Sequence, residues 1–289
     1  MRLVAALPLP WPFDREYMQL ALAAGLAVGA SAPLIGVFLV QRRLSLMGDG
    51  VGHVAYAGVG AGLLLGVWPV WSALVVAVAG ALAIEWLRSR GRATGDLALS
   101  LLFYGGIAAG VVMVGKADVG SVSVSSYLFG QILTVQASDV GVVVALGLGI
   151  LLAIGVTGRA LFALVLDEES ARVAGIPADG LNALLAVLTA VTVVAAMQVV
   201  GLLLVAALMV LPVATSRLVS ASFRATVIGA VVVGVVSVVG GLAAARQWGL
   251  APGGAIVLVA VLMFAIAALV TRGRSASAPA VQQTARTDG

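Results

Sequence analysis

The fold is decided by residues 181–219, which read LNALLAVLTAVTVVAAMQVVGLLLVAALMVLPVATSRLV. No charged residue occurs in this stretch before Arg217. About 20 apolar residues in a helix cross the hydrocarbon core of a bilayer, so the stretch is long enough for two crossings. Met197-Gln198 gives a weak polar break in its middle. We therefore predict two membrane-spanning helices, at residues 181–198 and 199–219.

Apolar runs of similar length recur along the rest of the chain. They predict further spans at residues 17–40, 51–67, 69–87, 97–115, 139–157, 225–244 and 254–271. Hydrophobic residues make up 62% of the 289 residues and charged residues 10%, whereas about 25% of a soluble protein is charged. The sequence thus predicts an all-α integral membrane protein with about nine transmembrane helices. Glycine is abundant, with 36 residues, and small residues let helices approach closely in lipid.

The basic residues predict how the spans are oriented. If spans 1, 3, 5, 7 and 9 end in the cytoplasm, most of the 16 Lys and Arg residues lie there, as the positive-inside rule expects. They are Arg42, Arg43, Arg88, Arg90, Arg92, Arg159, Arg172, Arg217, Arg224, Arg272, Arg274 and Arg286. The prediction is an extracytoplasmic segment 1–16, a membrane domain 17–272 and a disordered cytoplasmic tail 273–289. The net charge of +4 lies in these short loops, which argues against binding to nucleic acid.

Two connections between spans are unusual. On the outer side, residues 127–133 form an apolar piece too short to cross the membrane, which predicts an interfacial or re-entrant helix. On the inner side, the loop of about 158–180 contains the most charged stretch of the chain, DEESARVAGIP at 167–177. Its acidic start and its Gly and Pro end predict a short helix. Two interpretations of that helix stay open, a docking element and a solvated connector.

Residues 110–117, GVVMVGKA, match most of a phosphate-binding P-loop. The match fails because Ala117 replaces the Ser or Thr whose hydroxyl binds Mg²⁺. The motif also ends a membrane span, where no strand precedes it. We therefore expect no ATPase site, and the protein is predicted not to be an enzyme.

His53 is the single histidine and cysteine is absent, so one chain cannot form a multi-His zinc site or a Cys nucleophile. Asp49 lies four residues before His53, which places both on one helix face, where they can share one cation. An ionisable group within an apolar span is costly unless it is paired or lines an aqueous path. The alternative is that Asp49 caps its helix and His53 bonds a neighbouring helix. Asp96, at the start of a span, is interpreted as a helix cap.

Two prolines lie within predicted spans. Pro33 and Pro212 are each expected to kink a helix and free backbone carbonyl groups. Broken helices often line transport routes through membranes.

Several motifs, in this order and spacing over residues 17–272, resemble the permease subunits of zinc/manganese-type metal-ion ABC importers. They are RRLSLMGD (42–49) running into His53, SYLFG (126–130), the acidic loop ending at Gly175-Ile176, VVG (199–201), LPVATSR (211–217), GGL (240–242) and PGG (252–254). In many relatives another histidine lies in the fourth span, where this sequence has Phe103, Tyr104 and Gly105.

The resemblance implies a type II ABC importer permease fold in a bacterial plasma membrane. It implies a homodimer with two cytoplasmic ATP-binding subunits and an extracytoplasmic metal-binding protein, with ATP bound by the partner. Zinc is the expected cargo and manganese or iron the alternative, with no permanently bound cofactor. It also implies roles for individual residues: Asp49 and His53 in the metal pathway, Asp167, Glu168, Glu169, Arg172 and Gly175 in coupling to the ATPase, and Tyr127, Leu128, Phe129 and Gly130 in an outer gate.

Three other functions make different demands on the sequence. A permease for iron chelates or vitamin-like substrates does not need the Asp49–His53 pair. An ion-coupled secondary transporter is expected to carry more intramembrane carboxylates and inverted repeats. An intramembrane hydrolase needs a paired nucleophile and base, which one histidine and no cysteine do not provide.

Overall fold

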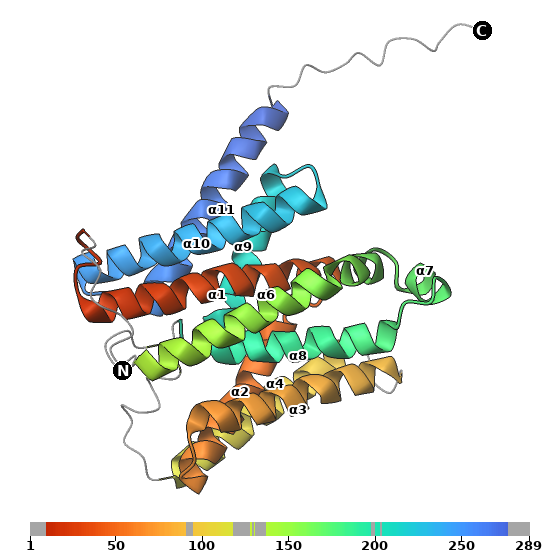
Figure 1. The fold of residues 1–289 in the computed structure, drawn as a ribbon, viewed down its shortest axis with the longest axis horizontal. Helices are drawn as coiled ribbons and strands as arrows, with labels where there is room; N and C mark the ends of the chain where they lie inside the picture. The colour runs from red at the N-terminus through yellow and green to blue at the C-terminus, as the bar shows by residue number, and fades with distance from the viewer. Residues whose placement is uncertain are drawn as a thin grey trace, which may run out of the picture.

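The computed structural model describes residues 10–90, 95–117, 128, 130, 137–197, 200–202 and 204–276. These residues form a bundle of helices (Figure 1). The helices are α1 (Glu16–Gln41), α2 (Met47–Leu65), α3 (Pro69–Ser89), α4 (Gly95–Lys116), α6 (Ala137–Leu166), α7 (Glu168–Val173), α8 (Ala178–Met197), α9 (Val205–Val219), α10 (Phe223–Trp248) and α11 (Pro252–Ala276).

The prediction of an all-helical membrane protein is confirmed, and each of the nine predicted spans overlaps one helix of at least 15 residues. Seven of them are long and apolar enough to cross a membrane: α1, α3, α4, α6, α8, α10 and α11. The other two are α2, whose sequence is rich in glycine and includes Asp49 and His53, and α9, which has 15 residues. Length and composition alone therefore support seven spans, and the count of nine stays a prediction.

Three boundaries differ most from the predicted ones. Helix α6 continues nine residues past the predicted end at 157, to Leu166, because residues 158–166 contain one charged residue and no proline. Helix α9 begins at Val205 rather than at 199. Helix α11 reaches Ala276 and so includes the first residues of the predicted tail. Residues 277–289 lie outside the described part of the chain.

Residues 200–202, which lie between α8 and α9, are buried in the protein. Gly201 has a positive φ of 87°, and Val200 and Leu202 on either side are almost fully buried. Non-helical backbone is tolerated at membrane depth where protein rather than lipid surrounds it. Helix α8 thus ends at Met197, where the sequence predicted a break, and α9 begins only at Val205.

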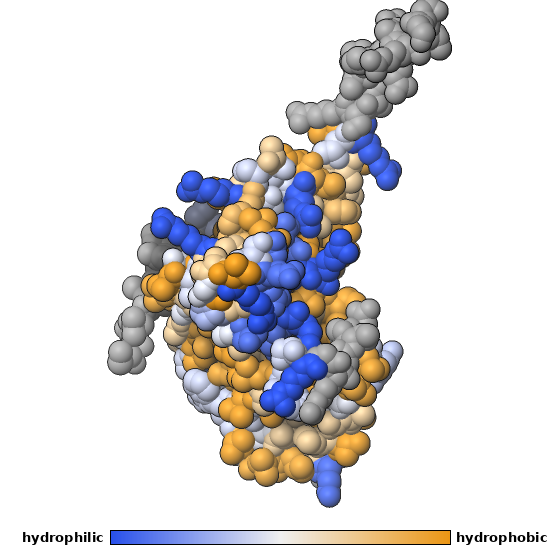
Figure 2. Space-filling model, turned by 90° about the vertical axis from the view of Figure 1, so that its right-hand side faces the viewer, coloured by the Kyte–Doolittle hydropathy of each residue, from blue (hydrophilic) through white to orange (hydrophobic). Residues whose placement is uncertain are grey.

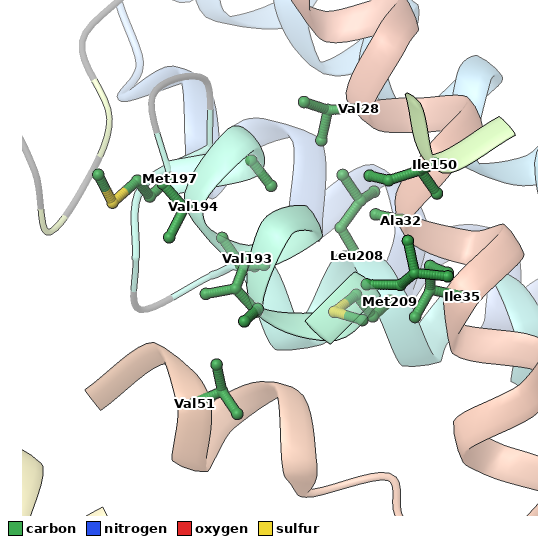
Figure 3. Close-up of a cluster of buried hydrophobic side chains, with 14 of the residues drawn as sticks. Val28, Ala32, Ile35, Val51, Ile150, Val193, Val194, Met197, Leu208 and Met209 are labelled. Carbon is green, nitrogen blue, oxygen red and sulfur yellow. The ribbon is translucent and has the colours of Figure 1, made fainter. Parts of the chain in front are cut away.

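Helices α1 and α8 form the interior of the bundle, whereas α4 and α11 are largely exposed along their length. Apolar side chains meet where α1, α2, α6, α8 and α9 pack together (Figure 3). The labelled members of this cluster are Val28, Ala32, Ile35, Val51, Ile150, Val193, Val194, Met197, Leu208 and Met209. Pro33 and Pro212 lie inside α1 and α9 and are both buried.

The crossing of α1 and α9 depends on one glycine. A Cβ added at Gly36 would overlap the backbone oxygen of Met209, and backbone atoms cannot move aside as a flexible side chain can. We expect Gly36→Ala to lower the free energy of unfolding by about 1–3 kcal/mol, the usual cost of overpacking. The measurement is the thermal midpoint of the purified protein in detergent.

Gly105→Ala is the matched control, because a Cβ at Gly105 meets nothing within 4 Å and alanine is the better helix former. Its midpoint should equal or exceed that of the wild type. Equal midpoints for Gly36→Ala and Gly105→Ala would contradict the close crossing.

Candidate metal site and coupling helix

Asp49 and His53 both lie on α2, one turn apart. The Asp49 Oδ1 atom is 3.8 Å from His53 Nε2. Leu46 occupies the N-cap position of α2, and no side chain there accepts a capping hydrogen bond. Asp49 instead lies in the first helical turn, where its negative charge faces the positive end of the helix dipole. The two side chains are thus close enough to share a cation, as the sequence indicated.

The surroundings of His53 come mainly from α4. The Phe103 ring contacts the imidazole edge to face, with 4.2 Å between ring centroids. A Cβ added at Gly106 would lie 2.7 Å from the carbonyl carbon of His53, so α4 touches the α2 backbone directly at this point. Phe103 and Gly106 therefore fix the position of His53 from one side. The neighbouring Tyr104 points outward and is exposed.

The Asp49–His53 pair is partly shielded from solvent. The His53 side chain is 12% exposed and that of Asp49 is 34% exposed. Within the described residues, no cluster of three or more His, Cys, Asp or Glu side chains is arranged to hold a metal ion. Zinc sites in proteins usually have four ligands, so one copy of the chain supplies an incomplete ligand set. A set of only two ligands would bind a metal ion weakly.

The predicted short inner helix is present as α7. Asp167 is its N-cap, and its carboxylate accepts hydrogen bonds from the Glu169 and Ser170 amides at 3.0 and 3.1 Å. The Ser170 hydroxyl also donates to Asp167, and this bond together with the amide bonds lowers the pKa of Asp167. Gly175 follows the helix with a φ of 79°. The chain therefore turns sharply out of α7 where the sequence predicted a stop.

An ionic network joins α7 to two other helices. Arg42, at the end of α1, donates to the Glu168 carboxylate over 2.7 Å and also to Asn182 of α8. Arg172 bonds both Glu168, at 3.0 Å, and Asp179, at 2.6 Å. Burial raises the pKa of Glu168, but the hydrogen bond from Arg172 and the charge of Arg42 outweigh burial, so the pKa is below its ordinary value. Glu168 is therefore ionised at neutral pH.

Sequence reasoning missed the partners in this network. Arg42 and Glu168 are separated by 126 positions, and no local pattern reveals such a pair. Asn182 stands out only as an amide at the start of an apolar helix. Val173 was also missed, and it is 87% exposed on α7. The sequence signal that could have revealed it is an apolar residue within the charged stretch 167–177.

Hydrophilic side chains gather at the end of the molecule that carries α7, and hydrophobic side chains surround them (Figure 2). The exposed side chains include all five tryptophans, as is common for tryptophan at membrane interfaces: Trp11, Trp68, Trp71, Trp86 and Trp248. Of the predicted outer gate, Leu128 is half-buried and Gly130 is buried with a φ of 73°. Tyr127 and Phe129 lie outside the described residues, as does the side chain of Asp96.

Comparison with known proteins places the chain among transport proteins. Residues 14–271 match the model of the ABC 3 transport family. A manganese transport system membrane protein from Halalkalibacterium halodurans is 34% identical over 87% of this chain and 86% of its own. A high-affinity zinc uptake system membrane protein from Haemophilus influenzae is 28% identical over 87% of this chain and 96% of its own.

A solved structure agrees with these sequence matches. The structure titled PsaBC from Streptococcus pneumoniae in complex with Fab superposes with a TM-score of 0.80 and 31% identity, over 88% of this chain and 91% of that one. The resemblance found in the sequence is confirmed. The chain therefore belongs to the ABC 3 transport family and is a multi-pass membrane permease, a transport component without an ATPase site of its own.

Proposed function

We propose that this permease conducts a divalent metal ion, Mn²⁺ or Zn²⁺, in an ABC importer powered by ATP hydrolysis on partner subunits. The observation that carries the proposal is the Asp49–His53 pair on helix α2. Relatives along nearly the whole chain support it, since they are named for manganese or zinc transport. Family membership also removes a stand-alone secondary transporter from consideration.

The ligand chemistry fits both cations. Imidazole suits zinc, whereas manganese prefers oxygen ligands such as the Asp49 carboxylate. Two copies of the chain facing each other would present two such pairs and complete a transient ligand set. An extracytoplasmic metal-binding protein would then capture the metal ion with high affinity, and the weak site in the permease would allow its release. Two ATP-binding subunits would supply different affinities for the outward and inward states.

The same proposal assigns an orientation. Nine spans put the amino terminus outside and α7 in the cytoplasm, beside the ATP-binding subunits. Asp167, Glu168, Glu169, Arg172 and Gly175 would shape the coupling helix, with Val173 as its apolar contact. Tyr127, Leu128, Phe129 and Gly130 remain the proposed outer gate, and Pro33 and Pro212 the proposed kinks.

The metal pathway is tested by Asp49→Ala and His53→Ala in cells that express the whole importer. We expect each variant to reduce radiotracer metal uptake at least about tenfold, because removing one of two ligands costs more than 1.4 kcal/mol of metal binding. Both Zn²⁺ and Mn²⁺ are supplied, and the cation whose uptake falls identifies the cargo. Uptake is compared at equal membrane abundance of the permease.

Asp139→Ala is the control for a helix-end effect. Asp139 is the third residue of α6, as Asp49 is of α2, so both changes remove a carboxylate from the first turn of a helix. If Asp139→Ala reduces uptake as much as Asp49→Ala does, the metal role of Asp49 is wrong. If wild-type cells import neither cation, iron and iron chelates are the next cargoes to assay.

A second prediction concerns the choice between the two cations. Phe103→His places another imidazole against His53, whose ring now contacts Phe103. Because nitrogen ligands favour zinc over manganese, we expect the ratio of Zn²⁺ to Mn²⁺ uptake to rise severalfold. Tyr104→His is the control, since Tyr104 points outward, and it should leave the ratio unchanged. Equal ratios in both variants would show that α4 does not face the pathway at this level.

A third prediction concerns the proposed contact between α7 and the ATP-binding subunit. Val173→Asp places a charge on the exposed apolar position of α7, where desolvation in an interface would cost energy. We expect the ATP-binding subunit to be lost during co-purification. Val173→Leu keeps the position apolar and should retain it. Normal co-purification of Val173→Asp would contradict a docking role for this position.

A further inference from the structure

The α7 helix has a polar connection to the start of the candidate metal helix. Arg42 is the C-cap residue of α1 and bonds Glu168 at the start of α7 over 2.7 Å. Its side chain is 8% exposed, so the charge is nearly enclosed. The chain connects α7 directly to α6 and α8, whereas this ion pair connects it to the corner between α1 and α2. Asn182 bonds both partners, since it accepts from Arg42 and donates to Glu168.

The corner between α1 and α2 is short and internally bonded. The Leu44 amide donates to Leu39 at 2.8 Å, and the Met47 amide donates to Leu44 at 2.9 Å. Arg43 has a φ of 60°, a left-handed conformation that non-glycine residues rarely adopt. A turn held this tightly cannot absorb much movement. Displacement of Arg42 is therefore passed to the start of α2, where Asp49 lies in the first turn.

This ion pair resists separation because the Arg42 side chain is nearly enclosed, although the Glu168 side chain is 35% exposed. Breaking it leaves an uncompensated charge out of water, which costs far more than losing an exposed pair. When α7 moves, keeping Arg42 and Glu168 together is therefore favoured over stretching the bond. Arg172 of α7 and Asn182 of α8 both bond the other oxygen of Glu168, at 3.0 and 3.3 Å. These bonds restrict rotation of the carboxylate, so it cannot follow Arg42 without moving α7.

We propose that the Arg42–Glu168 ion pair transmits movement of α7 to the α1–α2 corner, and through it to Asp49 and His53. Arg42 is thus a positioning residue that does not contact the metal ion. The inference rests on the proposed function, since it names how ATP-driven motion would reach the metal pathway. It goes further by assigning a role to a residue outside both the coupling helix and the metal pair.

The test uses the complete importer in proteoliposomes, with metal uptake and phosphate release measured in the same vesicles. The readout is metal imported per ATP hydrolysed. We expect Arg42→Met to lower this ratio about three- to tenfold, a typical range for residues that couple two sites. Arg42→Lys keeps a cation that can pair with Glu168 and should recover much of the ratio. A purely structural role would reduce the amount of assembled complex and leave the ratio unchanged.

The matched control is the double variant Glu85→Gln/Arg88→Met. This pair is also largely buried, with 2.8 Å between Arg88 and Glu85, but both residues lie on α3. Its ratio should stay at the wild-type value. A milder second variant, Glu168→Asp, shortens the link by one methylene group while keeping its charge, and it must also lower the ratio if Arg42→Met fails to assemble.

The outcomes distinguish failure of the Arg42–Glu168 link from failure of the proposed metal function. A wild-type ratio in Arg42→Met, or in assembled Glu168→Asp, overturns the link while the metal function stands. An equal fall of this ratio in the α3 control also overturns the link, because loss of any buried ion pair would then lower the ratio. If wild-type vesicles import no metal, the proposed function itself fails, and the link to a metal site fails with it.

Discussion

A lipid bilayer offers no partners to polar groups, and the position of α2 follows from that constraint. Asp49, His53 and a run of glycines make α2 too polar to face lipid along its whole length. Helices α3 and α4 pack along it, and α8 and α9 cover it further. The bundle thus covers much of α2, and the candidate metal pair is largely shielded without any special local structure.

Close approach between helices is the second requirement of this arrangement. Gly106 brings α4 against the backbone of α2 at His53, and Gly36 does the same for α1 at α9. These contacts have no hydrophobic driving force in lipid, so van der Waals packing must hold the helices together. The high glycine content is therefore part of how the interior is closed around polar residues.

The sequence predicted most of the helices because apolar length and polar loops are local properties. The same reasoning found the Asp49–His53 pair by its spacing and α7 by its acidic start and its Gly-Pro end. It could not find the contact of Phe103 with His53, or that of Arg42 with Glu168, because both depend on how distant helices pack. It also placed the start of α9 six residues too early, since buried non-helical backbone has the same apolar composition as a helix.

The polarity of α2 also has a consequence for how the protein is made. A segment enters the bilayer alone when its own hydrophobicity is sufficient, and α2 is not among the helices whose length and composition suffice for a crossing. We expect it to enter the membrane together with the apolar helices on either side, α1 and α3, as a single unit of three helices. The residues that suit a metal pathway thus make correct biosynthesis of α2 depend on its neighbours in the chain.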